Sequence, residues 1–161
     1  MATITFGSFP RSGNFFLVEL FRKNVPSISW NWVGHNAFLL TKYENSFTVI
    51  RNPLECIPSW ITYKNDTRQD RAEKVLDWYC SFYEKCELNK IKIYTFEYLI
   101  NDPIGFLNNI YNVDIANTDF SYFLNETKDK SNFDKINDEL KLASNFNKAI
   151  ELHKRLCVPV G

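Results

Sequence analysis

Two segments of the chain, about 40 residues apart, carry side chains suited to anion binding. The first covers residues 9–14, which read Phe-Pro-Arg-Ser-Gly-Asn between an apolar run and an amphipathic one. Arg11 offers a permanent charge, Ser12 a hydroxyl, and Gly13 a backbone that a ligand can approach closely. A helix that begins after such a loop leaves N–H groups free for an anion. The segment predicts an anion site or, alternatively, an ordinary strand–turn–helix connection with a surface arginine.

The second segment covers residues 47–60 and ends a β-branched and aromatic run with an arginine. Arg51 follows the run directly, and this is where open α/β sheets bind their ligands. Pro53 suits the first turn of a helix, and Ser59 lies two turns along it, within reach of the same anion. The alternative makes Arg51 a capping or salt-bridging residue and Ser59 a neutral surface position. Together the two segments predict paired anion sites at one sheet edge, spaced for a nucleotide with phosphates at both ends.

The candidate general base is one of two histidines. His35 lies between the two anion segments and follows a predicted strand, whereas His153 belongs to a long amphipathic stretch near the C-terminus. An imidazole can take a proton from an attacking hydroxyl near neutral pH. The alternative is that His35 is a solvent-exposed loop residue; Glu19, Glu44 and Glu97 are then the next candidates for the base.

These segments resemble motifs of the sulfotransferases that use 3′-phosphoadenosine 5′-phosphosulfate (PAPS). Residues 9–14 are similar to the family's 5′-phosphosulfate loop, and Arg51 with Ser59, eight residues on, is similar to its 3′-phosphate motif. Residues 93–103 are similar to a later strand and the stretch that follows it. The resemblance covers about residues 3–112 and implies a small, trimmed member of this family with a P-loop NTPase-like fold.

The resemblance also implies roles for individual residues. Arg11, with the rest of its loop, would hold the 5′-phosphosulfate, and Arg51 with Ser59 would hold the 3′-phosphate. Phe16 and Phe96 would flank the adenine. The implied donor-binding residues are Arg11, Ser12, Gly13, Asn14, Phe15, Phe16, Arg51, Ser59 and Phe96. His35 would deprotonate an acceptor hydroxyl or amine, and Arg11 would stabilise charge on the leaving oxygen. No metal is expected.

The chain departs from the family pattern at several positions. Asn14 and Phe15 replace the usual pair of threonines, and Phe15 cannot donate a side-chain hydrogen bond. Val33 replaces the lysine that often precedes the catalytic histidine, and no Arg-Lys-Gly segment occurs near the C-terminus. A noncatalytic nucleotide-binding relative therefore stays open as an alternative function.

A small-molecule kinase with an atypical phosphate loop is a further alternative. The P-loop pattern Gly-x-x-x-x-Gly-Lys-Ser/Thr is absent, because Gly13 is followed by Asn14 instead of lysine. The dinucleotide pattern Gly-x-Gly-x-x-Gly is absent as well. Sulfuryl transfer fits these residues better, since arginines, hydroxyls and backbone N–H groups can handle its donor.

Composition sets outer bounds on the protein class. The 161 residues are enough for one domain with a proper core. The 19 basic and 19 acidic residues balance, which gives no reason to expect nucleic acid or a membrane surface as a partner. We expect a cytoplasmic protein, because no signal peptide or membrane-spanning apolar run is present and four cysteines lack metal-site spacing. They are Cys56, Cys80, Cys86 and Cys157.

Hydrophobic periodicity predicts alternating strands and helices. Strands are expected over about 3–7, 27–32, 46–51 and 90–96, and helices over about 13–23, 36–42, 53–63, 71–85 and 103–111. This β-α-β order predicts a three-layer α/β sandwich with a central, mainly parallel sheet covered on both faces. We expect one domain over 1–161, with a nucleotide-binding core over about 1–112 and a helical part over about 113–161.

The C-terminal third is expected to be helical. A short helix is predicted over 117–125 and a charged turn over 126–130. One long helix then follows to about 156, with an apolar stripe that packs on the sheet; a dimer helix or an acceptor lid are the alternatives. The acceptor is a small molecule or a glycan whose identity the sequence leaves open. Its pocket is predicted around Trp30, Trp32, His35, Phe38 and the loop near Asn65.

Overall fold

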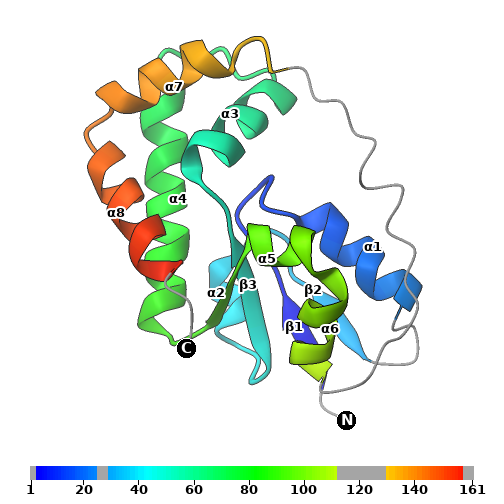
Figure 1. Ribbon diagram of the computed structural model, residues 1–161. Helices are drawn as coiled ribbons and strands as arrows, with labels where there is room; N and C mark the ends of the chain where they lie inside the picture. The colour runs from blue at the N-terminus through cyan, green and yellow to red at the C-terminus, as the bar shows by residue number, and fades with distance from the viewer. Residues whose placement is uncertain (1–2, 25–28, 112–129, 158–161) are drawn as a thin grey trace.

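Four short runs of β-branched and aromatic residues form a parallel sheet at the centre of the fold (Figure 1). The computed structural model describes residues 3–24, 29–111 and 130–157. Its strands are β1 (Ile4–Phe6), β2 (Trp30–Trp32), β3 (Ser46–Ile50) and β4 (Lys92–Thr95). They lie in the order β2-β1-β3-β4, and every pairing is parallel. The prediction of an α/β fold with a mainly parallel central sheet is confirmed.

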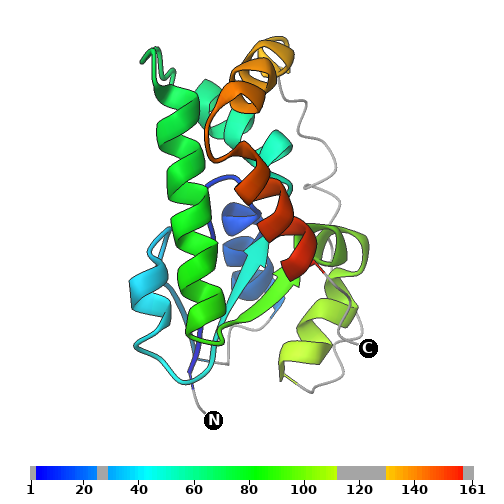
Figure 2. The ribbon, with the colours of Figure 1, turned by 90° about the vertical axis from the view of Figure 1, so that its left-hand side faces the viewer.

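Helices cover both faces of this sheet (Figures 1 and 2). Helices α1, α5 and α6 pack on one face, while α2, α3 and α4 pack on the other and carry α7 and α8 on their outer side. The bounds are α1 Asn14–Asn24, α2 Ala37–Leu40, α3 Pro53–Tyr63, α4 Arg71–Leu88, α5 Phe96–Asn101, α6 Pro103–Tyr111, α7 Phe133–Leu142 and α8 Phe146–Leu156. The arrangement is consistent with the predicted three-layer sandwich.

Strand β3 illustrates why the sequence folds this way. Its side chains alternate between the two faces, as the pleat requires. Phe47 and Val49 belong to the core beneath α1, α5 and α6, and Ile50 belongs to the core beneath α2, α3 and α4. All three are almost fully buried. A strand covered on both sides needs apolar residues at successive positions, and this is the pattern that predicted it.

The turn between β4 and α6 holds a helix that the sequence did not predict. The strand expected over 90–96 ends at Thr95, and α5 begins at Phe96. Thr95 caps this helix, because its hydroxyl accepts a hydrogen bond of 3.2 Å from the backbone N–H of Tyr98. The change brings Phe96 to the helix start, at the carboxyl edge of the sheet.

The prediction of one long C-terminal helix is wrong. The chain breaks between α7 and α8 at Ala143, whose ψ of 145° is extended. The turn is held by carboxylates of α4: the backbone N–H of Ser144 donates to Glu73 at 3.2 Å, and the Asn145 amide donates to Asp77. The break lets α7 pack across α3 while α8 runs along α4 (Figure 2).

Some predicted features lie outside the described residues. They are the helix over 117–125, the turn over 126–129 and the first two residues of the strand predicted over 27–32. Among the helices that the structure describes, none has the length and apolar character needed to cross a membrane.

The ion pair between Arg71 and Glu139 joins the start of α4 to α7. Arg71 donates from Nε and Nη2 to the two carboxylate oxygens at 3.1 and 2.7 Å, and these hydrogen bonds hold the pKa of Glu139 below its usual value of 4.5. A carboxyl whose pKa is lowered by folding stabilises the protein above its unfolded pKa. That stabilisation is lost as the pH falls through the folded pKa.

We therefore expect Glu139→Gln to unfold with a weaker acid dependence than the wild type. Between pH 6 and pH 3 the wild type should lose about 1 kcal/mol more of its free energy of unfolding than the variant, measured by urea denaturation. Asp138→Asn, at an exposed position of the same helix, is the control and should follow the wild type. Equal acid sensitivity in Glu139→Gln and the wild type would contradict the assignment.

Candidate functional site

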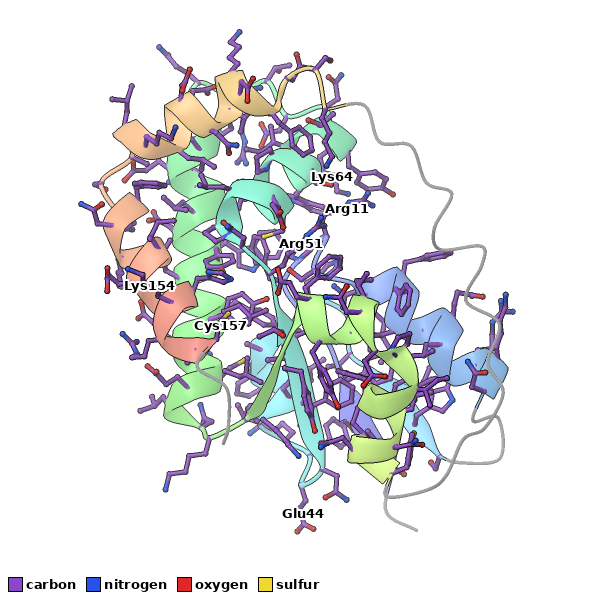
Figure 3. The ribbon with its side chains drawn as sticks, in the orientation of Figure 1. Arg11, Glu44, Arg51, Lys64, Lys154 and Cys157 are labelled. Carbon is purple, nitrogen blue, oxygen red and sulfur yellow. The ribbon has the colours of Figure 1, made fainter. Side chains whose placement is uncertain are left out.

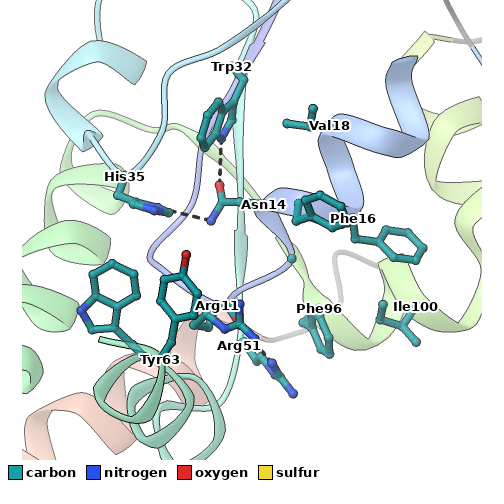
Figure 4. A pocket seen from close by; sticks show the side chains of 13 residues that line it. Arg11, Asn14, Phe16, Val18, Trp32, His35, Arg51, Tyr63, Phe96 and Ile100 are labelled. Atoms are coloured by element: carbon teal, nitrogen blue, oxygen red, sulfur yellow. Dashed lines mark hydrogen bonds between the residues drawn. The ribbon is translucent and has the colours of Figure 1, made fainter. Parts of the chain in front are cut away.

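A cavity of about 580 Å³ lies at the carboxyl edge of the parallel strands (Figure 4). Its walls come from α1, from α3 and from the segments that follow all four strands. The chain runs from β1 to β2 on one side and returns to β3 on the other, so β1 and β3 form a topological switch point, where open α/β sheets bind ligands. The lining residues are Arg11, Gly13, Asn14, Phe15, Phe16, Val18, Trp32, His35, Arg51, Trp60, Tyr63, Phe96 and Ile100.

The loop between β1 and α1 is shaped by backbone conformations that few residues adopt. Arg11 has a φ of 61° and Gly13 a φ of 97°, both in the left-handed region. Gly7 allows the neighbouring loop to approach, because a Cβ there would lie 2.5 Å from the carbonyl oxygen of Gly34. A Cβ on Gly13 would lie 3.1 Å from Leu99 of α5. The two glycines therefore let the loop sit tightly between the β2–α2 turn and α5.

The side-chain amide of Asn14 holds this loop in place through hydrogen bonds. Its Oδ1 accepts from the backbone N–H of Ser8 at 3.0 Å and from the indole N–H of Trp32 at 3.1 Å. Its Nδ2 donates to the carbonyl oxygens of Ser8 and Phe9, both at 3.1 Å. The predicted role for Asn14 was to hold a ligand oxygen, but these four bonds use the full capacity of its amide. The side chain acts as a scaffold for the loop.

The two predicted anion segments meet in the cavity through their arginines. Arg11 Nε donates to the Ser59 hydroxyl at 2.9 Å, and Arg51 Nη1 donates to the Arg11 carbonyl oxygen at 2.9 Å. Figure 4 shows the two guanidinium groups on one wall of the cavity. Ser59 itself is almost fully buried and sits behind Arg11, outside the lining. The segments therefore form one continuous basic wall, instead of two separated sites.

Arg51 is held in place from several sides. Its guanidinium carbon lies 4.1 Å from the centre of the Phe96 ring, and its Nε contacts Glu55 at 3.3 Å. The buried hydroxyl of Tyr79 donates to the Arg51 carbonyl oxygen at 2.8 Å. Burial raises the pKa of Tyr79 well above its usual value, so the phenol stays protonated as this donor. The arginine is thus oriented before any ligand arrives.

Ser12 does not line the cavity. Its hydroxyl is fully buried beneath the loop near Cys56 and Tyr83, and it makes no hydrogen bond of ordinary geometry. Burial raises the pKa of Cys56 to about 12, which keeps that thiol protonated. The placement of Ser12 does not bring its hydroxyl to the position predicted for a ligand oxygen.

His35 lies in the cavity wall with one ring nitrogen committed. Its Nδ1 is 2.8 Å from the carbonyl oxygen of Ser8. A carbonyl can only accept, so Nδ1 donates and Nε2 carries the lone pair in the neutral ring. Asn14 Nδ2 lies 3.4 Å from the same ring nitrogen. The two nitrogens are close because both donate to the carbonyl oxygen of Ser8. The Trp32, Trp60 and Trp78 rings surround the imidazole, with centroids 5.8 to 6.4 Å away.

Aromatic rings form the rest of the wall. Phe15 is exposed, whereas Phe16 is almost fully buried, and both line the cavity together with Phe96. One face of the Phe96 ring is already covered by Arg51, which leaves less of it for a planar ligand. Of the two tryptophans predicted for the acceptor pocket, Trp32 lines the cavity. Trp30 does not, and its half-buried ring packs against the core rings of Phe6 and Phe21.

Phe38, also predicted for that pocket, lies away from the cavity and contacts Lys42 and Lys85 through its ring. Trp60 and Tyr63 line the cavity and were missed as site residues. Trp60 and Tyr63 are three residues apart on the helix that begins at Pro53, so helical spacing indicates that their rings lie together but not that they line a cavity.

The charge of the lining is of one sign. Its ionisable side chains include two arginines and a histidine, and no aspartate or glutamate belongs to it. The first turn of α1, at the cavity edge, also lacks an acidic residue. Within the described parts of the chain, no group of three or more His, Cys, Asp or Glu side chains is placed to hold a metal ion. The cavity is therefore suited to an anionic ligand that also presents apolar or aromatic surface.

The other candidate bases lie elsewhere. Glu44 sits in the turn before β3, at the far end of that strand from Arg11 and Arg51 (Figure 3). Glu19 forms an ion pair with Arg22 on α1. His153 and Glu97 are outside the cavity lining as well.

No protein-family model, curated protein or solved structure matches the chain.

Replacement of Asn14 tests the scaffold role. We expect Asn14→Ala to lower the free energy of unfolding by about 2–3 kcal/mol, because buried groups of Ser8 and Phe9 lose their partners. Urea denaturation followed by circular dichroism measures the change. Asn24→Ala is the matched control, since that amide bonds one carbonyl at the end of the same helix. Similar stability of the two variants would show that the Asn14 bonds contribute little.

Proposed function

We propose that this protein is a sulfotransferase that moves a sulfuryl group from PAPS to a hydroxyl or amine of a small-molecule or glycan acceptor. The observation that carries the proposal is the meeting of Arg11 and Arg51 on one wall of the cavity. They come from the two segments that resemble the 5′-phosphosulfate and 3′-phosphate motifs. A donor with anionic groups at both ends needs such paired charges, and the P-loop NTPase-like fold belongs to the same proposal.

The cavity suits this donor in volume, in charge, in apolar surface and in the support that Ser59 gives to Arg11. Its volume lies within the range of about 300–1,000 Å³ that is usual for small-molecule sites. Arg11 and the first turn of α1 offer donors to the 5′-phosphosulfate, and Arg51 offers a guanidinium fork to the 3′-phosphate. Phe16 and Phe96 supply apolar surface for the adenine. Ser59 contributes by orienting Arg11 through the bond between them.

His35 is suited to the role of the base. Its bond to Ser8 fixes the tautomer in which Nε2 can accept a proton. PAPS supplies a sulfuryl group on a good leaving group. The acceptor oxygen or nitrogen forms a bond to sulfur, the bond from sulfur to the bridging oxygen breaks, and the acceptor proton passes to His35 Nε2. Arg11 stabilises the negative charge on the departing 3′-phosphoadenosine 5′-phosphate.

A noncatalytic nucleotide-binding protein is the second candidate. The positions of Ser12 and Asn14 favour it, because the Ser12 hydroxyl is buried outside the cavity and the Asn14 amide already donates to Ser8 and Phe9. This alternative keeps the basic wall and the nucleotide while it loses turnover. We also propose a cytoplasmic location, since the cysteines of the described residues are free thiols, as is usual in a reducing compartment.

Isothermal titration with 3′-phosphoadenosine 5′-phosphate, and with ADP as comparison, tests the donor site. We expect micromolar binding of the first and little binding of ADP. Arg51→Ala should weaken the first by about 2–3 kcal/mol, or roughly 30- to 150-fold, because a charged hydrogen bond is lost. Arg155→Ala, an exposed arginine that pairs with Glu87 on α4, is the control.

Equal affinity for the two nucleotides would remove Arg51 from its proposed role. Binding of ADP that requires Mg²⁺ would instead favour an atypical kinase.

Replacement of His35 separates catalysis from binding. His35→Asn keeps a donor near the Ser8 carbonyl and removes Nε2. We expect turnover to fall by about 100- to 10,000-fold while nucleotide affinity stays near that of the wild type. Turnover is the release of 3′-phosphoadenosine 5′-phosphate from PAPS with a panel of phenols, sugars and amines. His153→Asn serves as control. If His35→Asn turns over as fast as the wild type, the base is another group. If neither the wild type nor the two variants turn over, the noncatalytic candidate is favoured.

A further inference from the structure

A row of cations and aromatic rings extends the basic wall beyond the cavity. Lys64, at the end of α3, lies 4.9 Å from the Trp60 ring centre and 5.9 Å from that of Tyr63. Tyr63 in turn lies 5.2 Å from the Arg11 guanidinium carbon. Lys64 and Arg11 thus share the Tyr63 ring as a neighbour, and Figure 3 shows Lys64, Arg11 and Arg51 close to one another near the middle of the view. Lys64 is not itself a lining residue, and we call its position, beside the lining rings of Trp60 and Tyr63, the rim of the cavity.

The charge of Lys64 is not neutralised by the protein. Among the described residues it forms no ion pair. The nearest carboxylate in sequence, Asp66, receives hydrogen bonds from Arg68 at 2.7 to 3.2 Å, and these bonds lower the pKa of Asp66. Glu55, on the same helix as Trp60, pairs with Arg51. An exposed lysine beside two rings, with nearby acids engaged elsewhere, can meet the negative charge of a ligand.

Trp60 connects this rim cation to the proposed base. Its ring centre lies 5.8 Å from that of His35 and 4.9 Å from Lys64 Nζ. Tyr63 stacks beside it at 5.9 Å with an interplanar angle of 27°. A ring-bearing ligand with its hydroxyl at His35 Nε2 can therefore lie against Trp60 and present its other end to Lys64. An apolar platform with a polar group at each end sets the orientation of such a ligand.

From this geometry we propose that the acceptor is a ring-bearing hydroxyl compound with its own anionic group, which Lys64 binds at the rim. Carboxylate, sulfate and phosphate share the required chemistry. The inference rests on the proposed function, because it takes His35 as the base and Arg11 and Arg51 as the donor site. It assigns Trp60, Tyr63 and Lys64 to acceptor recognition. The charge of the acceptor gives specificity here, while the rings supply contact surface.

A purely structural role for Lys64 makes a different prediction. Lys64 caps the C-terminal end of α3, where the helix dipole favours a cation. If this were its whole contribution, Lys64→Gln would lower the free energy of unfolding without any effect on the choice between charged and neutral ligands.

The test uses ligand pairs that differ in one charge. The probes are 4-hydroxyphenylacetate with 4-hydroxyphenylacetamide, and methyl glucuronoside with methyl glucoside, titrated by ligand-observed NMR. The protein is first saturated with 3′-phosphoadenosine 5′-phosphate, so that Arg11 and Arg51 are occupied. We expect the anionic member of at least one pair to bind about two- to fivefold more tightly, as for an exposed ion pair. The preference should shrink when salt rises from about 0.05 to 0.5 M.

Three variants locate the preference. Lys64→Gln should bring the affinity ratio of the pair close to one, whereas Lys64→Arg should preserve it. Lys154→Gln, at an exposed position of α8, is the control for a general loss of positive charge. A ratio of one in the wild type for both pairs, no binding by either anionic member, or an unchanged ratio in Lys64→Gln would each overturn the proposal.

The probe pairs are also titrated without nucleotide, and the results are compared with the binding of 3′-phosphoadenosine 5′-phosphate and ADP. This comparison separates failure of the acceptor inference from failure of the donor assignment. If 3′-phosphoadenosine 5′-phosphate binds but no charge preference appears, only the acceptor inference fails. If a preference that depends on Lys64 is present while the nucleotide is not preferred over ADP, the rim anion site stands and the donor assignment fails.

Discussion

The site depends on one buried amide. The Asn14 side chain joins the backbone of the β1–α1 loop at Ser8 and Phe9 to the indole of Trp32, and the carbonyl of Ser8 in turn receives His35. Because each bond uses a different donor or acceptor position, the amide has one orientation that satisfies all of them. Three walls of the cavity are thereby fixed relative to one another by a single residue. The positions of the arginine-bearing loop and of the proposed base are consequences of this arrangement.

Arg51 shows how the rest of the fold prepares the basic wall. Long side chains usually lose rotamer freedom when they bind a ligand, which weakens binding. Here Phe96, Glu55 and the Arg11 carbonyl already restrict the guanidinium, and Tyr79 fixes the backbone behind it. Much of the ordering is therefore done during folding. The exposed carboxylate of Glu55 partly neutralises the charge of Arg51. A ligand anion can replace this carboxylate as the partner of the guanidinium.

The sequence predicts features of the site that depend on local order and misses those that depend on distant contacts. An arginine directly after a buried strand must lie at the carboxyl edge of a parallel sheet, so the place of Arg51 follows from pattern alone. The orientation of the Asn14 amide does not, because its partner Trp32 is 18 residues away. Burial of Ser12 depends on packing under α3 and α4. The hydrophobic pattern does not predict the break at Ala143, because the apolar spacing continues through it. The break is held by Glu73 and Asp77 of α4, which are about 70 residues away in the sequence.

The aromatic wall shows the same limit in another form. Trp60 and Tyr63 have the spacing of one helix face, which indicates that they lie together but not whether that face meets the core or a cavity. Only the tertiary arrangement of α3 against the β1–α1 loop decides this. A short sequence motif can point to single residues such as Arg11 and Arg51, whereas the aromatic wall beside them is defined by packing between distant elements.

The order of strands has a consequence for how the chain acquires this site. The first strand along the sequence, β1, lies inside the sheet between β2 and β3. It cannot complete its pairing until both later strands have formed, and parallel partners require long crossover connections. Tyr79 and Tyr83 of α4 lie later still in the chain, and their hydroxyls donate to the carbonyl oxygens of Arg51, just after β3, and of Val49 in β3. During synthesis, the basic wall is therefore assembled only after roughly half of the chain has emerged, and such non-local pairing slows folding. The loop between β1 and α1 therefore reaches its final surroundings only when later parts of the chain have joined the sheet.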